Sequence, residues 1–78
     1  MGHTERWHGR LHSEFFWVDV RVSRHNGRWI ASVDTPDGPT LAWGRTALSA
    51  LVEALEPFEG IKMDLVHSAP PDLVRLLE

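Results

Sequence analysis

The chain has 78 residues, no cysteine and a formal net charge of -3, with eight Lys and Arg residues against eleven Asp and Glu residues. This length allows one domain with a modest core, and the lack of cysteine excludes disulfides and thiolate metal sites. We expect a cytoplasmic protein that binds no membrane, because no apolar run approaches the roughly 20 residues of a membrane span and residues 1–8 lack a signal-peptide core.

The amino-terminal part of the chain is expected to be a flexible polar lead-in over residues 1–9, followed by a single domain over residues 10–78. Apolar and polar residues alternate from Phe16 to Ser23, which predicts a half-buried strand. Asn26-Gly27 is the preferred pair for a two-residue hairpin turn, so the run Trp29–Val33 is expected to return as the second strand.

The Asn26-Gly27 turn also sets the register of this hairpin. The expected cross-strand pairs are Arg24 with Trp29, Val22 with Ala31, and Val20 with Val33. The small and branched apolar residues then share one face, and a shift of one residue would destroy that agreement. The same register sets Asp19 opposite Asp34.

A turn and four further elements follow the hairpin. Thr35–Pro39 predicts a turn and Thr40–Trp43 a short third strand. Thr46 is a good N-cap for a helix with an apolar stripe, formed by Leu48, Leu51, Val52, Leu55 and Phe58. Ile61–Leu65 alternates like a fourth strand, and Leu73–Leu77 predicts a short terminal helix. The expected fold is a two-layer α+β domain of order β-β-β-α-β, with an antiparallel sheet packed on one helix.

A family pattern runs through Val18–Leu55. Its motifs are Asn26-Gly27-Arg28-Trp29, Pro36-Asp37-Gly38, Gly44-Arg45-Thr46 and the helix that ends at Leu55. This half of the chain resembles the N-terminal domain of HicB-type bacterial antitoxins and HicB-like proteins. The resemblance implies a partial ribonuclease-H-like fold without nuclease activity, assembly into dimers or tetramers and, in toxin–antitoxin pairs, binding of a small RNA-cleaving toxin.

The strongest functional signal is a set of apolar side chains on the sheet face that the predicted helix does not cover. Phe15, Trp17 and Ile30 alternate out of phase with the core positions. Exposed apolar patches often mark association sites, so these residues are candidates for a protein interface, most simply within a homodimer. The alternative is that the terminal helix, or the lead-in with Trp7, folds over them.

A second hypothesis rests on the arginines of the hairpin. Arg21, Arg24 and Arg28 lie on or near its two strands and are candidate nucleic-acid contacts, with Trp29 stacking on Arg24. The acidic balance of the whole chain weighs against this hypothesis, because nucleic-acid binding proteins usually carry a basic excess.

Catalysis and metal binding have weaker support in the sequence. Asp19 and Asp34 could form a carboxylate pair in a small hydrolase, but fraying of the strand before Asp34 explains them more simply. His3, His8 and His12 match no zinc signature in their spacing. We expect no catalytic residue, no metal and no cofactor. The leading hypothesis is a small non-enzymatic module that self-associates and is antitoxin-like or regulatory, with a small partner protein as a second candidate partner.

Overall fold

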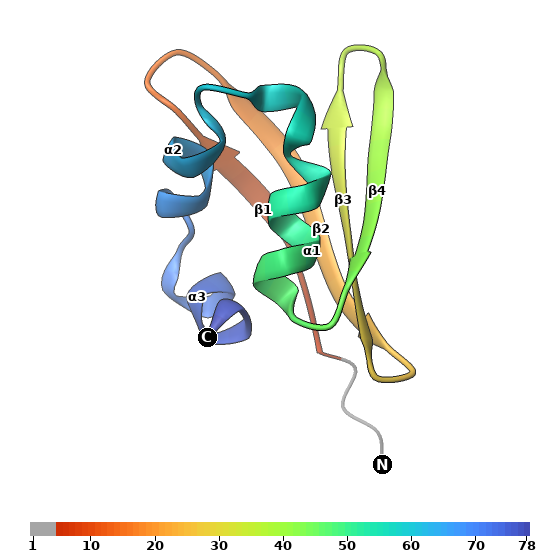
Figure 1. Ribbon diagram of the computed structural model, residues 1–78. Coiled ribbons are helices and arrows are strands. Elements are labelled where there is room, and N and C mark those ends of the chain that lie inside the picture. Colours follow the sequence, from red (N-terminus) through yellow and green to blue (C-terminus); the bar gives the residue numbers. More distant parts are fainter. Residues whose placement is uncertain (1–4) are drawn as a thin grey trace.

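The computed structural model describes residues 5–78, which form one antiparallel sheet covered on one face by helices (Figure 1). The strands follow the chain in the order β1-β2-β3-β4, and they are β1 (Arg6–His12), β2 (Trp17–His25), β3 (Arg28–Thr35) and β4 (Gly38–Gly44). The helices come after all four strands, and they are α1 (Ala47–Ala54), the 3₁₀ turn η1 (Glu56–Phe58), α2 (Lys62–His67) and α3 (Pro71–Leu77).

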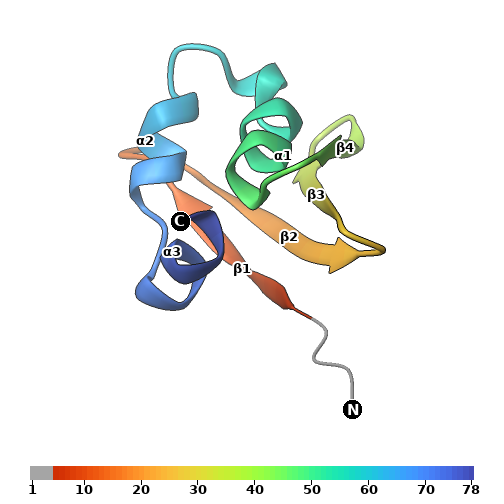
Figure 2. The ribbon, with the colours of Figure 1, turned by 60° about the horizontal axis from the view of Figure 1, so that its bottom comes forward.

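The helical layer divides into two parts over the sheet (Figure 2). Helix α1 packs mainly on β3 and β4, whereas α2 and α3 lie against β1. Alternating side chains of the strands meet these helices in a single core, whose largest fully buried members are Leu11, Leu51, Leu55, Leu65, Leu73, Val20, Val22 and Val33. The α+β class is therefore confirmed.

The expected element order is wrong at the start of the chain and after α1, whereas the expected terminal helix Leu73–Leu77 is present as α3. The supposed lead-in contains most of β1, since this strand begins at Arg6; residues 1–4 of that lead-in lie outside the described residues. Trp7 and Leu11 face the helices with Gly9 between them, and a Cβ at Gly9 would lie 2.6 Å from the Trp7 ring. The indole thus covers Gly9, and that glycine hides the alternation in the sequence.

The expected strand Ile61–Leu65 is wrong as well, because α2 occupies this segment. Its alternating apolar residues are also compatible with a helix, since Ile61 and Leu65 are four residues apart and share one helical face. Leu65 is fully buried, whereas Met63 is 52% exposed. The sheet therefore gains its fourth strand from the start of the chain and has three helices instead of the one expected to cover it.

The central hairpin is confirmed residue by residue. Asn26 and Gly27 have φ values of 52° and 78°, as a type I′ turn requires. The pairs Arg24–Trp29, Val22–Ala31 and Val20–Val33 all occur in the β2–β3 register.

Helix α1 begins where expected and buries part of the expected stripe. The Thr46 hydroxyl accepts the Ser49 backbone N–H at 3.1 Å, and the Ser49 hydroxyl accepts from the Thr46 N–H in return, so a capping box is present. The expected stripe is only partly buried: Leu51 and Leu55 lie in the core, but Leu48 is 40% exposed. Three alanines complete the buried face, and they are Ala47, Ala50 and Ala54.

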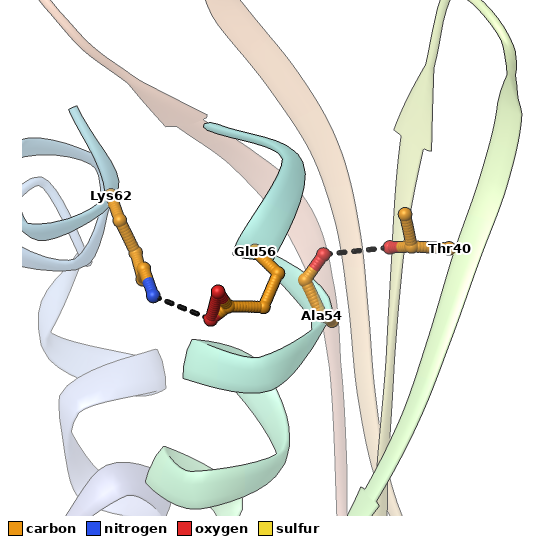
Figure 3. A network of polar contacts seen from close by, with 4 residues as sticks. All are labelled: Thr40, Ala54, Glu56 and Lys62. Carbon is orange, nitrogen blue, oxygen red and sulfur yellow. Dashed lines mark hydrogen bonds and ion pairs between the residues drawn. The ribbon is translucent and has the colours of Figure 1, made fainter. Parts of the chain in front are cut away.

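Small residues on α1 let the helix backbone approach the sheet closely. A Cβ at Gly44 would lie 2.8 Å from the backbone nitrogen of Ala50. At the other end of the helix, the Thr40 hydroxyl of β4 donates to the Ala54 carbonyl at 2.8 Å (Figure 3). Helix ends leave carbonyl groups without intrahelical partners, so this bond satisfies one of them from the sheet.

The turn after α1 is held by an ion pair. Lys62 of α2 lies with its Nζ 2.7 Å from Glu56 Oε2, which connects η1 to the start of α2 (Figure 3). On the far side, Ser68 accepts the His12 backbone N–H at 2.9 Å and donates to Leu65 at 2.7 Å, so the carboxyl end of α2 is tied to β1.

Gly44→Ala tests the close approach of α1 to β4. We expect the free energy of unfolding to fall by about 1–3 kcal/mol, because the new methyl group would overlap helix backbone that cannot rotate away. Urea denaturation measures this loss. Removing the nearby hydroxyl in Gly44→Ala/Ser49→Ala should not restore stability, since the Ala50 backbone remains in place; recovery in the double variant would contradict the backbone contact.

Candidate interaction surface

The face of the sheet opposite the helices is uncovered by any described segment, and we call it the open face. Its side chains come from alternate positions of all four strands. They are Arg6, His8, Arg10 and His12 on β1, Trp17, Asp19, Arg21, Ser23 and His25 on β2, Arg28, Ile30, Ser32 and Asp34 on β3, and Pro39, Leu41 and Trp43 on β4. The basic residues gather toward β1 and the apolar ones toward β4.

The β4 side of the open face carries a compact apolar patch. Ile30 is paired with Trp43, and Ser32 is paired with Leu41, so the three apolar side chains are close neighbours. Leu41 is 65% exposed and Trp43 is 49% exposed. Neither residue was predicted to lie in an interface. The alternation of Leu41 and Trp43 with Thr40 and Ala42 nevertheless indicates that the two apolar side chains share one face of the strand.

The three residues expected to form an interface do not lie in one patch. Ile30 belongs to the apolar patch near β4, whereas Trp17 lies at the start of β2, paired with His12. One face of the Trp17 ring is also covered by Arg10, whose guanidinium lies 3.8 Å from the ring centroid. Phe15 is 89% exposed but lies in the bend between β1 and β2, outside the sheet.

The three hairpin arginines are likewise divided between the faces of the sheet. Arg21 and Arg28 share the open face, whereas Arg24 has the opposite alternation and points to the helical side. Arg24 lies over the Trp29 ring at 5.9 Å and binds Glu5 at 2.9 Å. The expected stacking of Arg24 on Trp29 is therefore present, and Arg24 does not extend the basic surface of Arg21.

The two aspartates that suggested a carboxylate pair have other partners. The β2–β3 pairing ends at Val20–Val33, so Asp19 and Asp34 are not a registered pair. Asp19 instead faces Arg10 on β1, with Oδ1 3.2 Å from the arginine Nε. Asp34 lies within β3 and pairs with Pro39 of β4. The strand therefore does not fray before Asp34, and the expected explanation for the two aspartates is wrong.

The two edges of the sheet differ sharply in charge. Strand β1 has arginine or histidine at each position whose side chain lies on the open face, and α2 and α3 lie against it. Strand β4 has no charged residue and forms the other end of the sheet. Natural proteins usually protect an exposed edge with charge, so β4 has the features of an edge that accepts another strand.

Trp43 stands where the open face meets this edge. It lines a shallow hollow of about 610 Å³ with Leu48, Val52 and Glu53 of α1. It also lines a smaller hollow of about 240 Å³ with Arg28 and Arg45. The indole is therefore accessible from two directions.

Metal ligands do not converge among residues 5–78, where no group of three or more His, Asp or Glu side chains could hold an ion. His8 and His12 lie on the open face of β1, and His3 lies outside the described residues. No helix in the described part of the chain is long and apolar enough to cross a membrane.

Comparison of the chain with protein-family models, with curated proteins and with solved structures finds no match in any of the three. The resemblance of Val18–Leu55 to HicB-type antitoxins stays a prediction.

Asp19→Asn distinguishes an ion pair from a repelling carboxylate pair. We expect the free energy of unfolding to fall by about 0.2–1 kcal/mol, because an exposed ion pair with Arg10 is lost. Asp34→Asn is the control, and it should change stability by less. A gain of stability in Asp19→Asn, measured by chemical denaturation, would show that the two carboxylates repel each other after all.

Proposed function

We propose that this protein is a small self-associating interaction module, and that a second copy of the chain pairs with the outer edge of β4. The observation that carries the proposal is the contrast between the charged β1 edge and the uncharged β4 edge. Beyond Pro39, near the start of β4, the residues Thr40–Gly44 all carry a backbone N–H group. Only alternate residues of an antiparallel edge strand turn their backbone N–H and C=O groups away from the sheet. On β4 these residues are Pro39, Leu41 and Trp43, so the edge can offer two N–H donors and three carbonyl acceptors to a partner strand.

A two-fold axis fixes the register of such a pairing. Full antiparallel overlap of the seven residues of β4 puts the axis at Leu41, opposite Leu41 of the partner subunit. Trp43 then faces Pro39 of the partner subunit, and the exposed apolar residues of β4 meet across the axis. The two sheets become one sheet of eight strands, with the two apolar patches adjacent at its centre.

Burial of apolar surface supplies the driving force for this assembly. Leu41 and Trp43 are both about half exposed or more in the single chain. Removing such side chains from water stabilises an interface by roughly 25 cal/mol for each Å² of apolar surface buried. The strand pairing adds specificity, because only one register overlaps the whole strand and brings Leu41 and Trp43 together with apolar partners.

The proposed role is binding without catalysis. A cytoplasmic, antitoxin-like activity would follow if the predicted HicB resemblance holds, with a small partner protein bound by the dimer. In that case the dimer would present two copies of the open face on one continuous sheet.

Leu41→Lys tests the proposed interface. We expect the unmodified chain to sediment with twice the mass of the 8.9 kDa monomer, and the variant to sediment as a monomer. The new ammonium groups would face each other at the axis, and like charges directly opposite in a ladder are unfavourable. Analytical ultracentrifugation over a range of concentrations measures the change.

Met63→Lys is the matched control. Met63 is also more than half exposed but lies on α2, on the side of the molecule away from β4 (Figure 1). The control should keep the dimer mass. A monomeric unmodified chain at high concentration, or equal masses for the two variants, would contradict the proposal.

A further inference from the structure

A second surface of the open face has a different chemistry from the β4 edge. On the strands β1 and β2, a hollow of about 530 Å³ is lined by three basic side chains and a hydroxyl, which are Arg6, His8, Arg21 and Ser23. His8 is paired with Arg21, and Arg6 with Ser23, so the four side chains form two adjacent rows across the strands. Trp7 and Val22 complete the lining.

The positive charge of this hollow is not neutralised by the described carboxylates. Within residues 5–78, neither Arg6 nor Arg21 forms an ion pair, and no carboxylate lines the hollow. The nearest acidic residue of the open face, Asp19, is bound to Arg10 at 3.2 Å. Glu5 is bound to Arg24 at 2.9 Å.

Most of the acidic residues lie in the other layer of the molecule. Six of them follow β4 in the helices and their connections, and they are Glu53, Glu56, Glu59, Asp64, Asp72 and Glu78. The net charge of -3 therefore comes from the helical layer, and it does not describe the field over β1 and β2.

The geometry points to this hollow as a binding site for the phosphate groups of a single-stranded nucleic acid. Guanidinium groups donate paired hydrogen bonds to phosphate oxygens, and an imidazole and a hydroxyl add further donors. Two arginines, one histidine and one serine provide this set here. The inference does not depend on self-association, because the hollow lies at the β1 side of the sheet.

An extended strand suits this surface better than an isolated phosphate. A second cationic hollow, with Arg28 and Arg45 beside Trp43, lies on the β3–β4 side. Strands are about 4.8 Å apart, so the two hollows are separated by roughly 10 Å, which is more than one phosphate group spans.

Arg6→Gln/Arg21→Gln tests the site by fluorescence anisotropy with a labelled twelve-nucleotide oligouridylate at low salt. We expect the dissociation constant to rise at least tenfold in this double variant and to rise with salt in the unmodified chain. The control for a change of charge alone is Arg75→Gln on exposed α3, and it is compared with the single variant Arg21→Gln. Arg45 is left unchanged because it lines the second cationic hollow. The control should change the constant by less than twofold and Arg21→Gln by more than threefold.

Three results would overturn the inference. The first is no binding by the unmodified chain at low salt. The second is equal loss of binding in Arg21→Gln and Arg75→Gln, which would indicate net charge alone. The third is competition by uridine monophosphate at the same nucleotide concentration as unlabelled oligouridylate, which would assign the hollow to a free phosphate compound. Thermal melts of each variant check that these exposed substitutions leave the fold intact.

Discussion

The close contact between α1 and the β3–β4 half of the sheet is the constraint on which the rest of this structure depends. Gly44 and Ala50 bring the two backbones together, and Thr40 holds the far end of the helix by its bond to Ala54. Because α1 lies flat on this half, α2 and α3 are left to cover β1. All three helices thus occupy one face, and among residues 5–78 the opposite face has only side chains of its own strands.

This one-sided arrangement explains how an acidic chain can present a basic surface. The carboxylates of the helical segments lie in one layer, and the arginines Arg6, Arg10 and Arg21 lie on the opposite face of the sheet. The open face then divides again, into a basic region over β1 and β2 and an apolar region over β3 and β4. A surface of this kind can accommodate two functions side by side, with assembly at the β4 edge and a charged ligand nearer β1.

The sequence specified the central hairpin because several local signals agreed there. The Asn26-Gly27 turn and the alternation on both strands allowed a single register, and it is the one observed. The capping residue Thr46 likewise fixed the start of α1. Turns and caps are determined within a few residues, so their physics is visible in the chain itself.

Long-range packing could not be predicted in the same way. Gly9 conceals β1 because the Trp7 ring takes the place of a side chain there, and this is seen only in three dimensions. Ile61–Leu65 satisfies both a strand and a helix pattern, and burial of Leu65 against the rest of the core decides between them. For the surface, the side chain of Ile30 was found by alternation, but its neighbours Leu41 and Trp43 follow from the β3–β4 register.

The central claim is that β4 pairs with β4 of a second copy, and the absence of cysteine from the natural chain makes a direct test simple. In Leu41→Cys, the two thiols would lie opposite each other at the two-fold axis, where Cβ atoms are about 5 Å apart and a disulfide can form with a small adjustment. Mild oxidation should give a cross-linked dimer in high yield, and Met63→Cys should give little. Equal cross-linking of the two variants would contradict the account.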